Sequence, residues 1–168
     1  MLMNYYDKIA PGYEELHGQE QLKKLNLIAQ YINPKLSDTL LDVGCGSGIS
    51  TRFWKCKRFG IDPSEELIKL AREKDKDGDY LIGTAEKLPF PGNSFDFVIS
   101  ITAVHNFNDI GKALNEIKRV AKNKIVLSIL KKSQKIGEIK QLISGLFTIE
   151  KEINEEKDII LICMINPA

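Results

Sequence analysis

The chain has 168 residues, a length typical of a single domain with one core and one site. Hydrophobic residues make up 43% of it and charged residues 28%, a composition that excludes a disordered or fibrous protein. With 24 basic and 23 acidic side chains, the formal net charge of +1 favours no class of charged partner.

The cysteines and the N-terminal segment bear on the cellular compartment. Three scattered cysteines are too few for a disulfide framework and lack the paired spacing of a zinc site, so we expect a reducing compartment and no metal. The opening MLMNYYDKIAPGYEEL carries tyrosines, acids and a proline where a secretory signal would have a basic start and an apolar run. No stretch reaches the length of a membrane span. We therefore predict a cytoplasmic protein with no membrane span.

The first predicted element is an amphipathic helix between Gln19 and Ile32. Apolar residues recur there at helical spacing, and Asn33-Pro34 ends the pattern. Together with the segment before it, this helix would make residues 1–34 an N-terminal lid and helix.

From residue 39 onward, short apolar strands alternate with helices. A short helix is expected directly after the glycine cluster that follows the first strand, and Ser64 is expected to cap the helix at 64–74. Alternation at this spacing implies parallel strands joined by right-handed crossovers, which is a doubly wound sheet. The predicted strands are 39–43, 58–62, 79–83, 95–100 and 124–130, and the predicted helices are 64–74 and 109–122.

The end of the chain breaks this alternation. A helix at 135–144 is followed by strands at 146–153 and 158–165, and the polar turn between these strands predicts a hairpin. The predicted fold class is therefore α/β, a doubly wound, seven-stranded, mostly parallel sheet with a C-terminal antiparallel hairpin, forming one domain over residues 1–168.

The strongest functional signal is the segment Asp42-Val43-Gly44-Cys45-Gly46-Ser47-Gly48, directly after the first strand. In a parallel sheet, ligands bind beyond the carboxyl ends of the strands where the winding reverses. Glycines there let the backbone approach a ligand closely. A dinucleotide site would need a glycine where Ile49 stands. Asp42 would repel a pyrophosphate but attract a ligand that carries an ammonium group.

The second signal is Asp62, at the end of the second strand. A carboxylate at this place can accept hydrogen bonds from both vicinal hydroxyls of a ribose. This geometry suits NAD as well as S-adenosylmethionine, and Asp62 could also cap the helix that follows Pro63.

The third signal is the segment GTAEKLPF at 83–90, followed by the strand FDFVIS at 95–100. Together with the opening YYDKIAPGY, the loop LLDVGCGSG and the acid in GIDPS, these segments resemble the class I S-adenosylmethionine-dependent methyltransferases, in particular the broad group that contains the quinone-biosynthesis methyltransferases. The resemblance covers nearly the whole chain. It implies a Rossmann-like methyltransferase fold, S-adenosylmethionine as cofactor, and methyl transfer as the activity.

The resemblance also implies particular contacts to the cofactor. Asp42 and the amides around Gly44 and Gly46 would hold the methionine part, and Asp62 the ribose. The Ala85 amide would meet the adenine edge, and Glu86 would replace the acid that family members often carry where Thr84 stands. Ile101 would line the floor near the sulfonium, and tyrosines of the opening segment would close over the cofactor. The predicted cofactor-binding residues are Tyr6, Tyr13, Asp42, Gly44, Cys45, Gly46, Asp62, Pro63, Thr84, Ala85, Glu86 and Ile101.

His105 is the one candidate catalytic residue. Its unperturbed pKa lies near neutrality, so the imidazole could act as a general base on the methyl acceptor. It could instead orient a substrate or cap the next helix. The chemistry itself belongs to the cofactor, which leaves the protein mainly to position the acceptor and to exclude water.

The acceptor side is predicted to be open, because only Lys131-Lys132-Ser133-Gln134 fills the place where small-molecule methyltransferases often insert lid helices. We therefore expect a large acceptor, such as RNA or protein, or a partner subunit that completes the pocket. Methyltransferases of RNA and protein that need a small zinc-binding activator are the model for such a partner. Lysines and arginines between 118 and 140 could contact phosphates or could form a solvated face.

Two other functions stay open at this stage. An NAD-dependent oxidoreductase would use the same sheet and Asp62, although Ile49 and Asp42 argue against it. A methyltransferase-like subunit could also bind a partner without catalysing a reaction. The acceptor itself, whether RNA, protein or small molecule, is not encoded in any motif.

Overall fold

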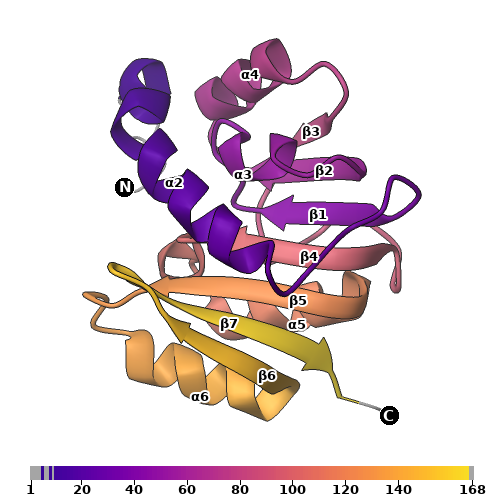
Figure 1. The fold of residues 1–168 in the computed structure, drawn as a ribbon, viewed down its shortest axis with the longest axis vertical. Helices are drawn as coiled ribbons and strands as arrows, with labels where there is room; N and C mark the ends of the chain where they lie inside the picture. The colour runs from indigo at the N-terminus through magenta and orange to yellow at the C-terminus, as the bar shows by residue number, and fades with distance from the viewer. Residues whose placement is uncertain (1–4, 6–7, 9, 167–168) are drawn as a thin grey trace.

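The computed structural model describes residues 5, 8 and 10–166 and contains a seven-stranded sheet with the order β3-β2-β1-β4-β5-β7-β6 (Figure 1). β1 to β5 pair in parallel, whereas β7 is antiparallel to both β5 and β6. The predicted doubly wound sheet with its C-terminal hairpin is confirmed. The strands are β1 (Thr39–Val43), β2 (Lys57–Asp62), β3 (Asp79–Ile82), β4 (Phe95–Ile101), β5 (Ala121–Leu130), β6 (Phe147–Asn154) and β7 (Asp158–Ile165).

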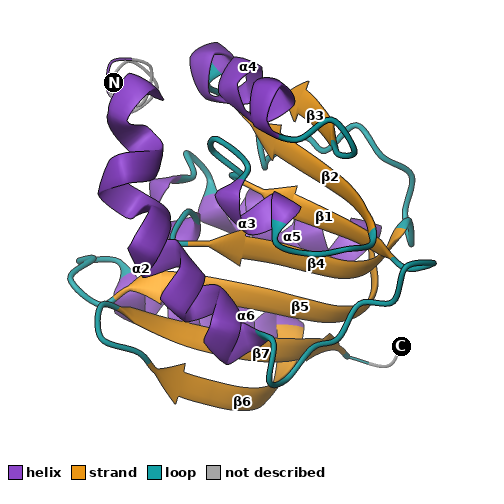
Figure 2. Ribbon diagram, turned by 45° about the horizontal axis from the view of Figure 1, so that its top comes forward, coloured by secondary structure: helices purple, strands orange, loops and turns teal. Residues whose placement is uncertain are grey.

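Helices cover both faces of the sheet (Figure 2). α2 packs on one face, in an apolar cluster with Leu40, Ile99 and Val126, and α3 contacts both α2 and β1. α5 and α6 pack on the opposite face, around Leu41, Ile125 and the other residues of the largest cluster. The helices are α2 (Tyr13–Ile28), α3 (Ile49–Arg52), α4 (Glu65–Lys74), α5 (Ile110–Val120) and α6 (Ile136–Leu146), with 3-10 turns η1 (Ala10–Gly12) and η2 (Val104–Asn106).

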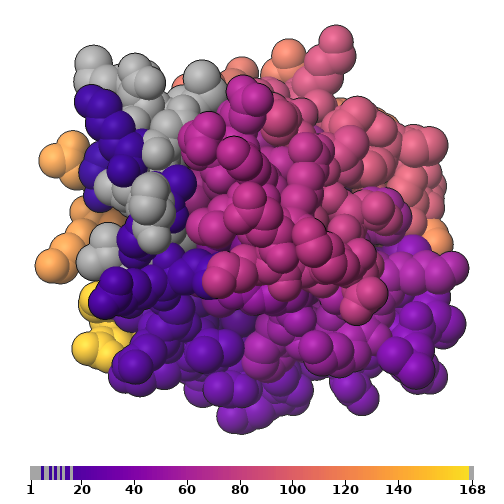
Figure 3. Space-filling view, turned by 90° about the horizontal axis from the view of Figure 1, so that it is seen from above, coloured from indigo at the N-terminus to yellow at the C-terminus, as the bar shows by residue number. Residues whose placement is uncertain are grey.

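The winding of the sheet reverses between β1 and β4. From β1 the chain goes outward to β2 and β3, and then returns to β4 on the other side of β1. The carboxyl ends of β1, β2 and β4 therefore meet at one edge, where an open α/β sheet binds its ligands. η1 contacts α4 above this edge, and the view from above shows the segment of α4 beside the N-terminal segment (Figure 3).

Both ends of α2 differ from the prediction. α2 begins at Tyr13 rather than Gln19 and ends at Ile28 rather than Ile32. Ile32 is still buried, because two turns after the helix return its amide to the carbonyl of Ile28 at 3.1 Å. The apolar spacing therefore identified the buried Leu25, Ile28 and Ile32, but Leu22 is exposed and the predicted helix end was wrong.

The strand after α5 also begins earlier than predicted. α5 ends at Val120 and β5 starts at Ala121, which pairs with Phe95. Helix and strand follow each other without a loop. The predicted cap of α4 is confirmed, since the Ser64 hydroxyl accepts a hydrogen bond from the Leu67 amide at 3.3 Å.

Candidate functional site

The loop between β1 and α3 depends on glycine conformations. Gly44, Gly46 and Gly48 have positive φ values of 76°, 55° and 83°. A Cβ on Gly44 would lie 2.6 Å from the Cβ of Ala103, which follows β4. A side chain at this position would therefore be both strained and blocked, and the loop can pass close to the end of β4 only because Gly44 lacks one.

Backbone amides of this loop are already used to tie it to β2. The amides of Gly44 and Cys45 both donate to the Ile61 carbonyl, at 2.8 and 3.1 Å. The Gly46 amide donates to Asp62 Oδ2 at 3.0 Å. The glycine amides were predicted to hold a ligand directly. In the structure these three amides already have partners on β2.

Asp62 connects three segments at the end of β2. Its Oδ2 accepts from Gly46, and its Oδ1 accepts from the Ser64 amide at 2.9 Å. The carboxylate therefore orients the start of α4 as well as the glycine loop. A carboxylate has about four lone-pair positions, which allows this one side chain to accept several hydrogen bonds at once.

Asp42 lies under the loop, fully buried. Its Oδ2 accepts hydrogen bonds from Ser50 Oγ at 2.5 Å and Thr51 Oγ1 at 2.8 Å, both on α3. Its Oδ1 has no hydrogen-bond partner among the described residues. Burial raises the pKa of Asp42 to about 6. The hydrogen bonds from the two hydroxyls lower this pKa, whereas the negative charge of Asp62 raises it further.

A first pocket of about 430 Å³ opens beside the loop. Five residues predicted to bind the cofactor line it: Gly44, Pro63, Thr84, Ala85 and Glu86. Asp62 lies between Ile61 and Pro63, which both border the pocket. The sequence interpretation missed Asn106, Phe107 and Asn108, which complete the wall at the end of η2 and directly after it. The sequence contains one indication of their role, which is that they follow shortly after β4, the strand that ends where the winding of the sheet reverses.

Glu86 has a structural partner that was not foreseen. Its Oε1 accepts a hydrogen bond from the Asp109 amide at 3.1 Å, at the N-terminal end of α5. The side chain borders the first pocket while it fixes the start of that helix.

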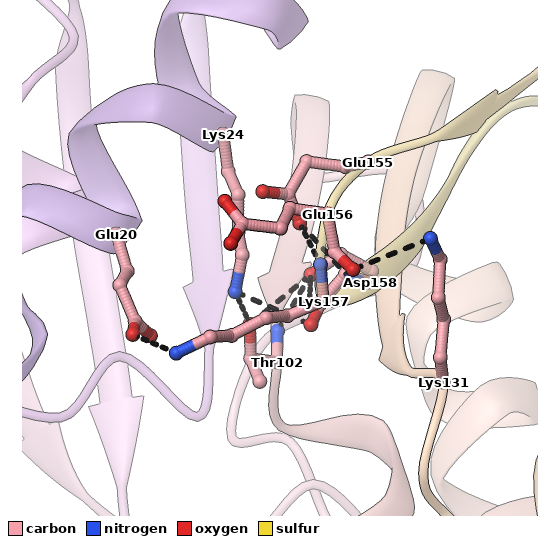
Figure 4. A network of polar contacts seen from close by, with 9 residues as sticks. Glu20, Lys24, Thr102, Lys131, Glu155, Glu156, Lys157 and Asp158 are labelled. Carbon is pink, nitrogen blue, oxygen red and sulfur yellow. Dashed lines mark hydrogen bonds and ion pairs between the residues drawn. The ribbon is translucent and has the colours of Figure 1, made fainter.

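Thr102, directly after β4, has a strained backbone with φ of 55°. Its amide donates to Ser128 Oγ at 2.7 Å, and its hydroxyl donates to Asp158 Oδ2 at 2.7 Å. Lys24 Nζ donates to the same hydroxyl at 3.0 Å and lies 3.3 Å from Asp158 Oδ1 (Figure 4). Asp158 is 0% and Lys24 2% exposed, so a buried ion pair between α2 and β7 holds the strained residue.

His105 lies in η2 and borders a second pocket, of about 500 Å³, together with Thr102. Burial lowers the pKa of the imidazole, and the charges of Lys24 and Lys135 lower it further, whereas Asp158 raises it. Its Nδ1 is buried without a hydrogen-bond partner among the described residues. The side chain is therefore a neutral imidazole near pH 7, able to take up a proton.

The remaining predicted site residues are placed as follows. Ile101 is the last residue of β4 and is buried in the cluster under α2. Cys45 packs against Ile68, and burial raises the pKa of its thiol, so this side chain belongs to the core. Tyr6 lies outside the described residues. Tyr13 is the first residue of α2, and its side chain also lies outside what is described.

No cluster of three or more His, Cys, Asp or Glu side chains in the described ranges could hold a metal ion. Within the same ranges, each helix is too short or too polar to cross a membrane.

Comparison with known proteins identifies similar sequences. Residues 41–129 match the family described as a methyltransferase domain. An uncharacterised protein of Methanocaldococcus jannaschii is 32% identical over 122 residues, which cover 73% of this chain and 48% of the relative. Demethylmenaquinone methyltransferase of Thermotoga maritima is 31% identical over 140 residues, covering 76% and 60%. The chain thus spans about half to three fifths of the length of these curated relatives.

Solved structures share the fold over almost the entire chain. A chain from the complex between the Haloferax volcanii Trm112 methyltransferase activator and a methyltransferase has a TM-score of 0.83 at 17% identity, covering 96% of this chain and 98% of that one. An S-adenosylmethionine-dependent methyltransferase of Thermotoga maritima has a TM-score of 0.77 at 19% identity, covering 99% and 100%. At these identities the similarity concerns the fold.

Proposed function

Because this chain belongs to the methyltransferase domain family, we propose that it transfers the methyl group of S-adenosylmethionine to an acceptor bound beside η2. The observation that carries the proposal is the junction of the glycine loop, Asp62 and the first pocket at the reversal of the winding. S-adenosylmethionine would supply a methyl group activated by its sulfonium. The protein's own residues would bind the cofactor, orient the acceptor and take up its proton.

The residues present fit this cofactor. Gly44 has no Cβ where one would meet Ala103, so the loop can pass close to the end of β4, and Gly44 borders the first pocket. Asp62 would accept the ribose hydroxyls, and Ala85 with Glu86 would border the adenine in the first pocket. Asp42 and the glycine loop would lie next to the methionine part, with Cys45 and Gly46 contributing backbone only. We also propose that the cofactor is bound by Pro63, Thr84, Ile101, Tyr6 and Tyr13.

Asp62→Ala is expected to weaken S-adenosylmethionine binding by about 1–3 kcal/mol, the usual effect of losing a charged hydrogen-bond acceptor. Titration calorimetry measures the affinity, and Asp79→Ala is the matched control because this exposed acid begins the neighbouring strand β3. The same titration is repeated with NAD. Unchanged affinity in Asp62→Ala would place the ribose elsewhere, and tight binding of NAD alone would favour an oxidoreductase.

We propose His105 as the residue that accepts a proton from the acceptor. A methyl acceptor with an N–H or O–H group must lose its proton, and a neutral imidazole beside the strained Thr102 is placed to receive it. His105→Gln is expected to lower the transfer rate roughly 100-fold, the lower end for a general base. Lys140→Ala is the control, since Lys140 pairs with Glu152 and does not line the pocket.

The pH profile separates this role from a structural one. At saturating S-adenosylmethionine, the rate of the native protein should fall on acidification through the lowered pKa of His105. In His105→Gln this part of the fall should vanish, and only the contribution of Asp42, whose pKa is about 6, should remain. Binding of S-adenosylmethionine should be the same in both proteins. An unchanged profile in the variant would remove His105 from the proton transfer.

The similarity to a chain from an activator complex supports a second proposal, that this chain works together with a partner subunit. The test compares the transfer rate of the purified chain alone with its rate after addition of a dialysed cell extract. Stimulation that protease treatment of the extract abolishes would support the partner. An equal rate without extract would contradict it, and cofactor binding without transfer in either case would favour a non-catalytic subunit.

A further inference from the structure

The second pocket lies directly beside the first. It is enclosed by α2, by the carboxyl ends of β4 and β5, and by the turn between β6 and β7. His105 lines this pocket, whereas Asn106, the next residue of η2, lines the first. A single 3-10 turn therefore separates the two pockets. The short connection after β5, from which an open acceptor side was predicted, forms part of this wall together with α2 and the hairpin turn.

The volume of about 500 Å³ falls in the range of sites for small molecules. Two polar atoms on its wall are buried and have no hydrogen-bond partner among the described residues, Gln21 Oε1 and His105 Nδ1. Gln21 is only 9% exposed. Because buried polar atoms in proteins are normally satisfied, these two indicate a ligand that brings polar hydrogens into the pocket.

The charges on the wall indicate a second property of the ligand. Lys24 is paired with Asp158, and Lys157 forms an ion pair with Glu20. Three charged side chains on the wall remain, Lys131, Lys132 and Glu156.

Neither Lys131 nor Lys132 forms an ion pair with an acid within the described residues. Lys131 Nζ donates to the backbone carbonyl of Glu156 at 3.4 Å, while Lys132 makes no hydrogen bond or ion pair within the described part of the chain. The wall thus has a surplus of positive charge, and it is located on the connection that follows β5.

We propose that this pocket binds the methyl acceptor, and that the acceptor is a small molecule with an acidic group held by Lys132 and assisted by Lys131. This assignment rests on the proposed function. The atom to be methylated carries a hydrogen and faces the wall formed by Gln21 and His105. The lone pair of this atom forms the bond to the methyl carbon. At the same time the bond between that carbon and sulfur breaks, and its electron pair stays on sulfur. The proton of the acceptor atom passes to His105.

The pocket can be tested without cofactor, because the chain has two histidines and both line it. The probes are benzoate, benzyl alcohol and benzylamine, which share a ring and differ in charge. Each is titrated into the purified chain while the imidazole resonances of His17 and His105 are followed by NMR, with His105→Gln assigning the signals.

Benzoate should shift both signals saturably and bind more tightly than the other two probes. Lys132→Ala should weaken benzoate about 10-fold, as expected for the loss of one charged contact. Lys140→Ala is the control, since this lysine pairs with Glu152 and does not line the pocket. Equal binding of benzylamine, an unchanged affinity in Lys132→Ala, or no shift with any probe would overturn the proposal.

A second experiment separates this inference from the proposed function. The chain is incubated with methyl-labelled S-adenosylmethionine and a whole-cell extract, and labelled products are divided into RNA, protein, and small molecules sorted by anion exchange. Label in retained, acidic small molecules is expected. Label in RNA, protein, or neutral and cationic small molecules would overturn the acidic acceptor while leaving methyl transfer intact. No label in any fraction would contradict the proposed function itself.

Discussion

Lys24→Met is expected to lower the free energy of unfolding by about 3–5 kcal/mol, because the substitution leaves a buried carboxylate without its counter-charge. Asp158 is fully buried and lies 3.3 Å from Lys24 Nζ. It also accepts the hydroxyl hydrogens of Thr102 and Ser128, so the loss of one partner disturbs the whole group. Urea unfolding followed by circular dichroism measures the change.

The chain contains a matched control for this prediction. Glu20 and Lys157 form a second ion pair between the same helix and the residue before Asp158, but both side chains are exposed. Lys157→Met should therefore leave the free energy of unfolding nearly unchanged. Lys24→Met/Asp158→Asn should recover most of the loss, because the amide oxygen still accepts the two hydroxyls and carries no charge. Equal losses in Lys24→Met and Lys157→Met would show that burial of the first pair is unimportant.

The second large effect concerns Asp42 and pH. Its pKa rises from 3.8 in the unfolded chain to about 6 in the folded protein, so the folded state binds the proton more tightly. The stability that this proton contributes is fully present below pH 3.8 and is lost as the pH rises through about 6. The shift corresponds to about 3 kcal/mol.

Asp42→Asn isolates this contribution, since the amide does not titrate. The difference in unfolding free energy between the variant and the native chain should move in favour of the variant by about 3 kcal/mol in total as the pH rises from below 3.8 to well above 6. Any constant cost of the amide cancels in this comparison. A difference independent of pH would show that Asp42 titrates normally in the folded state.

The same substitution should weaken S-adenosylmethionine binding, because the variant lacks the negative charge below the glycine loop. A variant that is more stable at neutral pH and binds the cofactor less well would show that the charge of Asp42 serves binding and not folding. Calorimetry on the material used for unfolding gives both values.

Much of the fold follows from patterns that are local in the sequence. Strand β1 was predicted with the observed limits, as was β7, since each is an apolar run between turn residues. The end of α2 was not, because Ile32 is buried by two turns after the helix and so continues its apolar spacing. The start of β5 at Ala121 was missed for a similar reason, since helix and strand join without the polar break that marks a boundary.

The candidate site was predictable only in part. Gly44 and Ala85 were found through motifs, and both border the first pocket. The group around Lys24 and Asp158 was not foreseen, because the two residues are far apart in sequence and each resembles an ordinary surface charge. Nothing in a single sequence pairs a lysine of an amphipathic helix with the first residue of a late strand. The strained backbone of Thr102 depends on that pair and was equally hidden.

The contact between α2 and β7 also sets an order on synthesis. The wall of the second pocket combines Gln21 and Lys24 from the start of the chain with Lys157 from near its end. A nascent chain that has delivered β1 to β5 already has every residue assigned to the first pocket, but neither the hairpin nor the acid that neutralises Lys24. Lys24 must therefore stay in water until residue 158 leaves the ribosome. The residues assigned to the donor are therefore all made before the wall of the second pocket can be completed.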